Sequence, residues 1–117
     1  MSHFRTLRTL LTDAEILKAS LRELGIFVKT DADVRGFNGQ KVKADIVAVL
    51  EGGHDIGWRR NINGYFDMIA DLSGVAKSHD QPKLITALNQ KYAVNQTLAQ
   101  VKQLGLKNAN VKLMVQD

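Results

Sequence analysis

Apolar residues recur along the chain with two periods, one typical of helices and one typical of strands. Phe4–Leu10 is short and half apolar, which predicts a first strand. Thr12 and Glu15 have capping-box spacing, so Thr12 is expected to begin a helix that ends at Leu24-Gly25. The leucines of this helix recur at helical spacing. One face of the helix should therefore be buried.

A helix that stops at glycine and then leads into a strand occurs twice. The first helix continues into a strand from Ile26 toward Val34. A second helical region follows Pro82, with a bend or break expected near Ala93. This region ends at Leu104-Gly105 and leads to a last strand over Ala109–Val115. The repeat suggests two βαβ-like halves folded as one unit.

Three further strands between the helices form an antiparallel meander over Val42–Leu50, Asp55–Asn61 and Tyr65–Leu72. A three-residue turn with a left-handed Gly64 places Arg59 opposite Asp67 and groups Trp58 with the apolar residues of the last strand. Trp58 is then a core residue rather than a ligand-stacking one. A Gly52-Gly53 turn upstream would add Val47 and Val49 to that apolar face.

The opposite face of the meander has more apolar residues than is usual for a sheet face exposed to water. One interpretation is that loops or terminal residues cover it, and the other is that it binds a second copy or a protein partner. The residues that this pattern assigns to a partner surface are Ile46, Ala48, Leu50, Arg59, Tyr65, Asp67 and Ile69.

The composition removes several classes of function. A chain of 117 residues fits a single domain over residues 1–117, and it contains no cysteine for thiol catalysis or thiolate metal sites. No segment has the roughly 20 apolar residues of a membrane span, so membrane insertion is not expected and we expect a protein of the cytoplasm or of the equivalent compartment of an organelle. The net charge of +4 leaves nucleic-acid or ribosome binding open as an alternative, through Arg5, Arg8, Arg35, Arg59 and Arg60.

Motifs for chemistry are few. The pairs His54-Asp55 and His79-Asp80 resemble metal ligands, but the only other histidine is His3, so both pairs are interpreted as turn and cap residues. Asp67 and Asp71 would be about 13 Å apart on a strand, too far for joint acid–base work. We therefore predict no catalytic residue, metal or cofactor, and we favour an adaptor over an enzyme. A small-molecule or cofactor-binding enzyme is a third hypothesis, and it would need a pocket with convergent polar groups.

Six segments stand out for their order along nearly the whole chain: Met1–Phe4, Val34–Gly39, Asp55–Trp58, Ala70–Leu72, Lys91–Ala93 and Val115-Gln116. Together they resemble a family of cyanobacteria and algal plastids named hypothetical chloroplast open reading frame thirty-five, also called domain of unknown function twelve fifty-seven. The resemblance implies a cyanobacterial cytoplasm or a plastid stroma as the setting, and it brings no activity or residue role with it.

Together these patterns predict an α+β domain. It should contain one antiparallel or mixed sheet of five or six strands, with two or three helices mainly on one face. A ferredoxin-like βαββαβ plan with an inserted hairpin is one form that this could take. The predicted function is a non-catalytic accessory or adaptor protein that binds a protein partner through the open sheet face.

Overall fold

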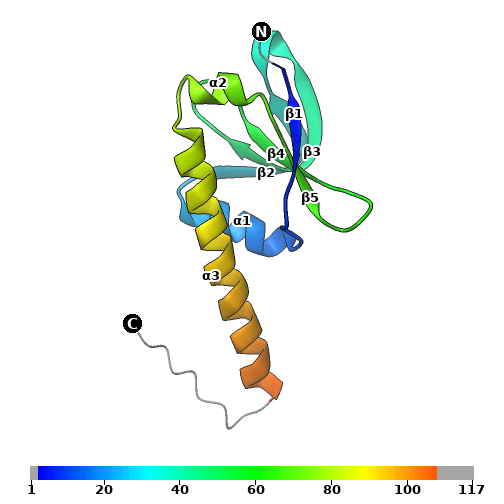
Figure 1. Cartoon of the computed structure of the whole chain (residues 1–117), viewed down its shortest axis with the longest axis vertical. Helices are drawn as coiled ribbons and strands as arrows, with labels where there is room; N and C mark the ends of the chain where they lie inside the picture. The colour runs from blue at the N-terminus through cyan, green and yellow to red at the C-terminus, as the bar shows by residue number, and fades with distance from the viewer. Residues whose placement is uncertain (1–2, 108–117) are drawn as a thin grey trace.

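The centre of the molecule is one open antiparallel sheet, and the computed structural model describes residues 3–107 (Figure 1). Its strand order is β1-β5-β4-β3-β2, which confirms the expected α+β class. β1 and β2 are joined through α1 but lie at opposite edges of the sheet, so they do not form an adjacent βαβ pair. The strands are β1 (Arg5–Arg8), β2 (Phe27–Arg35), β3 (Lys41–Val49), β4 (Ile56–Arg60) and β5 (Phe66–Ala70).

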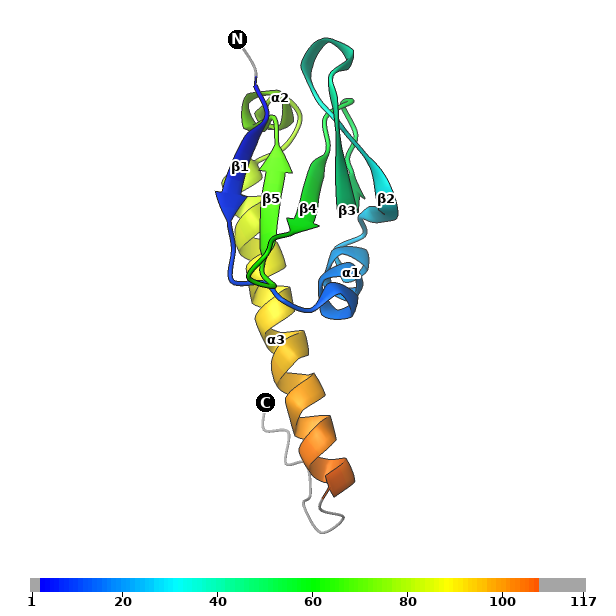
Figure 2. The same ribbon diagram turned by 90° about the vertical axis from the view of Figure 1, so that its right-hand side faces the viewer.

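Two of the three helices cover one face of the sheet. α1 (Ala14–Glu23) and α3 (Gln81–Lys107) contribute Leu17, Leu21, Leu88 and Tyr92 to the main core, and α2 (Leu72–Ala76) follows β5 directly. Figure 2 shows α3 passing behind β1 and β5 and continuing beyond the ends of the strands. Trp58 is 1% exposed in this core, which confirms its predicted place.

The helix ends differ from those predicted. Asp13, not Thr12, caps α1, because Asp13 Oδ1 accepts a hydrogen bond from Ile16 N at 3.0 Å. α3 runs without interruption past Ala93 and Gly105, so the predicted break and the predicted end at Leu104-Gly105 are both wrong. The strand predicted over Ala109–Val115 lies outside the described residues.

The register between β4 and β5 is the predicted one. Trp58 lies opposite Met68, and Arg59 lies opposite Asp67. Gly64 has φ +87°, the left-handed conformation that the three-residue turn requires. The turn is closed by a hydrogen bond from Asn61 N to Tyr65 O at 2.7 Å. Turn chemistry and strand alternation were therefore sufficient to predict this hairpin.

The register between β3 and β4 is shifted by one residue from the predicted one. Ile46 lies opposite Trp58 and Ala48 opposite Ile56, so Ile46, Ala48 and Leu50 belong to the core beneath the helices. Val47 and Val49 consequently lie on the other face. The connection is a loop over residues 50–55 rather than a two-residue turn, and Leu50 N donates to Asp55 Oδ1 at 3.1 Å to close it.

The outer face of the sheet is partly covered by the chain itself. The β2–β3 hairpin coils at Asp31, which has φ +46°, so that its far half lies over β4. The side chains of Val34 and Ala44 lie directly over Gly57, and the ring of Phe4 lies over Gly36. One interpretation of this face was cover by loops and terminal residues. In this half the cover comes from the strands of the hairpin, with Phe4 near the N-terminus over Gly36.

Candidate functional site

An ion pair between a partly exposed arginine and a buried carboxylate holds the far end of the β2–β3 hairpin against the sheet. Asp55 is 1% exposed and accepts hydrogen bonds from Arg35 Nε and Nη2, both at 2.8 Å. It also accepts from the backbone amides of Arg35, at 3.0 Å, and Leu50, at 3.1 Å. Two carboxylate oxygens thus receive four hydrogen bonds. This saturated geometry is typical of a structural carboxylate rather than of a general base.

The electrostatics of this pair agree with that interpretation. Burial alone would raise the pKa of Asp55, but the hydrogen bonds from Arg35 and Leu50 outweigh burial and hold the pKa below its usual range. The hydrogen bond to Asp55 likewise raises the pKa of Arg35, against the opposing effect of burial. Both groups are therefore charged at neutral pH, and the carboxylate has little tendency to take up a proton.

A second buried carboxylate lies beside the first. Asp71 Oδ1 accepts from Gly74 N at 3.1 Å and caps α2, while Oδ2 accepts from Phe37 N at 3.2 Å. The Nε2 atom of His54 is 3.9 Å from Asp71 Oδ2, and the His54 ring lies directly over Gly74. We call Arg35, His54, Asp55 and Asp71 the polar anchor. Three of the segments that carry the family resemblance, Val34–Gly39, Asp55–Trp58 and Ala70–Leu72, meet there.

The histidine pairs do not form a metal site in the part of the chain that the structure describes. His79 Nε2 lies 2.7 Å from Glu51 O and His54 Nδ1 lies 3.3 Å from Gly52 O, so both rings contact turn carbonyls. Within residues 3–107, no three His, Asp or Glu side chains are grouped so that they could hold a metal ion. The polar anchor therefore fastens the hairpin and the start of α2 to one end of the sheet.

A different surface has the character of an interface. Around β1 and the β4–β5 turn, four large apolar side chains are exposed: Leu7 by 43%, Leu10 by 86%, Ile62 by 99% and Tyr65 by 40%. Together with Arg8 between them we call these residues the edge surface. Of the strands in the described residues, β1 ends the sheet and pairs only with β5. Soluble proteins usually cover or charge such an edge.

Two hollows flank the edge surface. One is a mainly apolar groove of about 510 Å³ between β1 and α3, and Trp58 and Met68 form part of its lining. The other, of about 380 Å³, lies beside the β4–β5 turn and is lined by Leu10, Ile62, Tyr65 and their neighbours. Arg8, Thr9 and Leu10 border both hollows. The edge surface therefore offers both apolar side chains and concave space.

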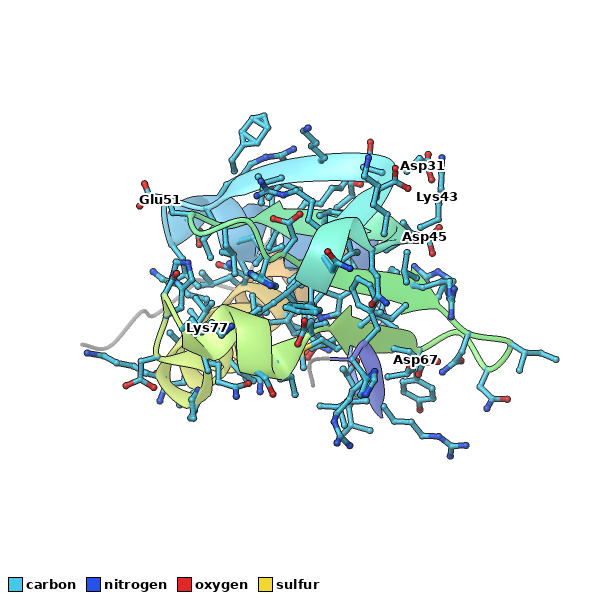
Figure 3. All side chains as sticks on the ribbon, turned by 90° about the horizontal axis from the view of Figure 1, so that it is seen from above. Asp31, Lys43, Asp45, Glu51, Asp67 and Lys77 are labelled. Carbon is cyan, nitrogen blue, oxygen red and sulfur yellow. The ribbon has the colours of Figure 1, made fainter. Side chains whose placement is uncertain are left out.

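The structure separates the residues predicted for the partner surface. Ile46, Ala48 and Leu50 are buried beneath the helices, so their predicted place on the open face is wrong. Ile69 lies on the outer face but is also buried. Arg59, Tyr65 and Asp67 remain accessible near the edge surface. Figure 3 shows Asp67 on the same side of the molecule as Asp45 of β3.

Sequence reasoning missed Leu7, Leu10 and Ile62. The exposure of Leu7 depends on β1 being the edge strand, which no local pattern shows. Two signals were available in the sequence. Ile62 is an apolar residue in a polar turn, and Leu10 and Leu11 are adjacent, so in extended backbone they cannot both point toward the core.

The arginines of the nucleic-acid alternative are also divided. Arg35 is held by Asp55, and Arg60 Nη1 donates to Thr12 O at 2.9 Å and Gly64 O at 2.7 Å. Arg60 also lies 4.2 Å from the centroid of the Phe66 ring. Arg5, Arg8 and Arg59 are exposed. Two of the five predicted cations are thus engaged in intramolecular contacts.

Comparison with known proteins places the chain in a family. A family model described as "Protein of unknown function (DUF1257)" matches residues 20–114. The chain belongs to the DUF1257 family. This confirms the resemblance found in the sequence. The chain is also similar to "Uncharacterized protein ycf35" of Guillardia theta, with 34% identity over 112 residues, which cover 94% of this chain and 86% of the relative.

A second relative of this DUF1257 protein carries the same name in Pyropia yezoensis. It is 28% identical over 125 residues, covering 99% of this chain and 97% of the relative. No solved structure matches the chain. Among the described residues of this DUF1257 protein, no helix combines the length and apolarity that crossing a membrane requires.

Proposed function

We propose that this DUF1257 protein is a non-catalytic adaptor that binds a protein partner through the edge surface. The observation that carries the proposal is the exposure of four large apolar side chains around β1. A soluble protein keeps such side chains in contact with water at a cost, and burying one leucine fully contributes roughly 1.5–3 kcal/mol. A partner that covers Leu10 and Ile62 recovers much of that free energy.

The rest of the molecule supports an adaptor rather than an enzyme. The carboxylates of Asp55 and Asp71 accept hydrogen bonds from backbone amides and from Arg35, so they hold the fold in place. The mainly apolar groove beside β1 has Arg8 as its one charged lining residue among the described side chains. Such a lining suits an apolar segment better than a reacting polar substrate. We place the protein in a cyanobacterial cytoplasm or a plastid stroma, as its relatives suggest.

A comparative pull-down tests the proposal. The tagged chain, Leu10→Asp, Ile62→Asp and the control Phe27→Asp are each incubated with nuclease-treated lysate of a photosynthetic host. Phe27 is 60% exposed on β2, at the opposite edge of the sheet, so its substitution alters a similar side chain away from β1. Trp58 emission and circular dichroism establish that each variant is folded.

We expect at least one protein to be retained by the unaltered chain and by Phe27→Asp, and to be lost from the other two variants. The proposal fails if folded Leu10→Asp and Ile62→Asp retain every protein that the unaltered chain retains. A second copy of the chain as the only retained protein would identify a homo-oligomer instead.

Nucleic-acid or ribosome association is the second candidate, supported by the exposure of Arg5, Arg8 and Arg59. Arg8 and Arg59 lie in one row of the sheet, on either side of Asp67. Binding of a fluorescent single-stranded RNA should then weaken steeply between low and moderate salt, and more so for the unaltered chain than for Arg8→Gln. Salt-independent binding would exclude this candidate.

A further inference from the structure

We infer that the edge surface takes an extended acidic segment of its partner as an added strand on β1, with alternate apolar side chains of that segment entering the groove between β1 and α3. This inference rests on the proposed function and specifies the chemistry of the partner. The observations that support it are the edge position of β1, the shape of the groove and the distribution of charge around both.

The backbone of β1 is suited to strand addition. β1 pairs with β5 along one side, and all four of its residues are exposed. In an antiparallel ladder each strand directs alternate pairs of N–H and C=O groups toward either side. The side of β1 away from β5 therefore presents backbone groups to an incoming strand. This is the mode of recognition known as β-augmentation.

The groove explains how side chains of the added strand would be recognised. Leu7 and Leu10 border it on one side, and Leu88, Tyr92 and Ala93 of α3 border it on the other. Side chains of a strand alternate between the two faces of a sheet. Every second residue of a strand added to β1 would therefore point toward the groove. Apolar side chains at those positions would bury both themselves and the exposed part of Leu7.

The charge distribution selects an acidic segment. Residues 1–12 and 81–107, the segments of the sequence that contain β1 and α3, include six lysines and arginines and no aspartate or glutamate. The remainder of the chain contains ten basic and twelve acidic residues, so the positive net charge comes from these two segments. Arg5 and Arg8 are exposed on β1 itself. Arg8 pairs with Asp67 and so lies on the face away from the groove, whereas Leu7 pairs with Met68 on the groove side. Acidic side chains at the positions of an added strand that point away from the groove would lie near Arg8, whereas basic ones would be repelled.

The same argument disfavours a second copy of this chain as the occupant. Two β1 strands that pair antiparallel in a centred register place Arg5 of one copy opposite Arg8 of the other, twice. Like charges directly opposite each other destabilise a strand pair. The partner segment is therefore expected to differ from β1 in charge and to alternate apolar residues with aspartate or glutamate.

A display experiment tests the inference even while the partner is unidentified. A random library of 12-residue peptides on phage is selected against the immobilised full-length chain, with Lys29→Glu and Arg8→Glu variants in parallel. Lys29 is an exposed residue of β2, at the far edge, and serves as the matched control. We expect peptides that alternate apolar with acidic residues from the unaltered chain and from Lys29→Glu. Arg8→Glu should instead enrich peptides with lysine or arginine at the polar positions.

An enriched peptide without tryptophan or tyrosine is then titrated while the emission of Trp58 is recorded. Trp58 is the only tryptophan and lines the groove, so it reports occupancy directly. We expect Leu10→Lys to weaken binding about tenfold or more. Methylation of alternate peptide nitrogens should abolish binding, because it removes the donors of the strand pair. Amides of β1 should exchange more slowly when the peptide is bound.

The inference is overturned by any of three results: no enrichment, enriched peptides with basic or helical periodicity, or enrichment that Arg8→Glu leaves unchanged. A dimer that Leu10→Lys dissociates would assign the edge to a second copy and also overturn it. The three peptide results do not alter the pull-down outcome. Suppose that Leu10→Asp loses a protein partner in the pull-down, while no acidic extended peptide binds the chain. The proposed function would then stand, and only the acidic added strand would be excluded.

Discussion

Arg59 on β4 lies directly opposite Asp67 on β5, yet Asp67 Oδ1 accepts its hydrogen bond from Asn61 Nδ2, at 3.1 Å. Arg8 on β1 faces the same carboxylate from the other side. Neither arginine lies within 4 Å of an acidic oxygen in the part of the chain that the structure describes. Two guanidinium groups thus border the edge surface without an ion pair, which suits them to contact a partner.

Removal of the Arg59 charge should therefore have little effect on folding. We expect Arg59→Gln to change the free energy of unfolding by less than about 0.5 kcal/mol, as for most exposed charges. Urea denaturation at low and high salt measures this change. A loss of more than about 1 kcal/mol that high salt removes would indicate a strong ion pair with Asp67 and contradict the account.

Tyr92 of α3 should contribute to stability through its hydroxyl group as well as through its packing. Its hydroxyl oxygen accepts hydrogen bonds from Thr12 N at 3.1 Å and Asp13 N at 2.9 Å, so it fastens the start of α1 to α3. Tyr92→Phe leaves both amides without this partner, and we expect a loss of about 1–3 kcal/mol in urea denaturation. Tyr65→Phe, at an exposed tyrosine, is the matched control and should be nearly neutral. Equal effects of the two variants would refute this role.

The pKa of Asp55 predicts a pH dependence of stability. The pKa is lower in the folded than in the unfolded protein, so the folded state favours the ionised form. The stabilisation is therefore present above the pKa of an ordinary aspartate and is lost as the pH falls through the lower, folded-state value. We expect the free energy of unfolding to fall on acidification through this range, and to fall less steeply in Asp55→Asn. Identical slopes for the two proteins would contradict this assignment.

Gly57 should tolerate no side chain. A Cβ at this position would collide with the side chains of Val34 and Ala44, which cover β4 from the coiled hairpin. We expect Gly57→Ala to lower the free energy of unfolding by roughly 1–3 kcal/mol. Gly105→Ala is the control, because its Cβ would have no neighbour within 4 Å and alanine favours a helix. An unaffected stability in Gly57→Ala would show that the hairpin does not lie over β4.

The fold could be predicted where local chemistry determines it. The β4–β5 hairpin follows from the left-handed Gly64 and from the alternation of apolar and polar residues along both strands, which puts Trp58, Phe66 and Met68 on one face. All of these signals lie within a few residues of the turn. The β3–β4 register could not be predicted from Gly52-Gly53, because it depends on Asp55 binding Arg35, twenty residues away. Asp55 closes the loop over residues 50–55, but nothing in the sequence around it shows that its carboxylate is buried.

The candidate site was harder to predict than the fold for the same reason. Leu7 and Leu10 are exposed because β1 pairs with β5, which lies about sixty residues further along the chain, and because β1 then ends the sheet. Ile46 and Ile69 are both apolar strand residues that were assigned to one face. The one-residue shift between β3 and β4 moves Ile46 to the core, whereas the β4–β5 register keeps Ile69 on the outer face. The sequence shows that both faces of the sheet carry apolar residues, but it does not show which of these residues remain exposed.

The most direct test of the adaptor account is site-specific photo-crosslinking. A benzoylphenylalanine residue replaces Leu10 in one variant and Phe27 in another, since both positions are exposed and lie at opposite edges of the sheet. Each variant is irradiated in nuclease-treated lysate of a photosynthetic host, and the adducts are identified by mass spectrometry. The account predicts a discrete protein adduct at position 10 that is absent at position 27. The same adducts at both positions, or none at position 10, would contradict it.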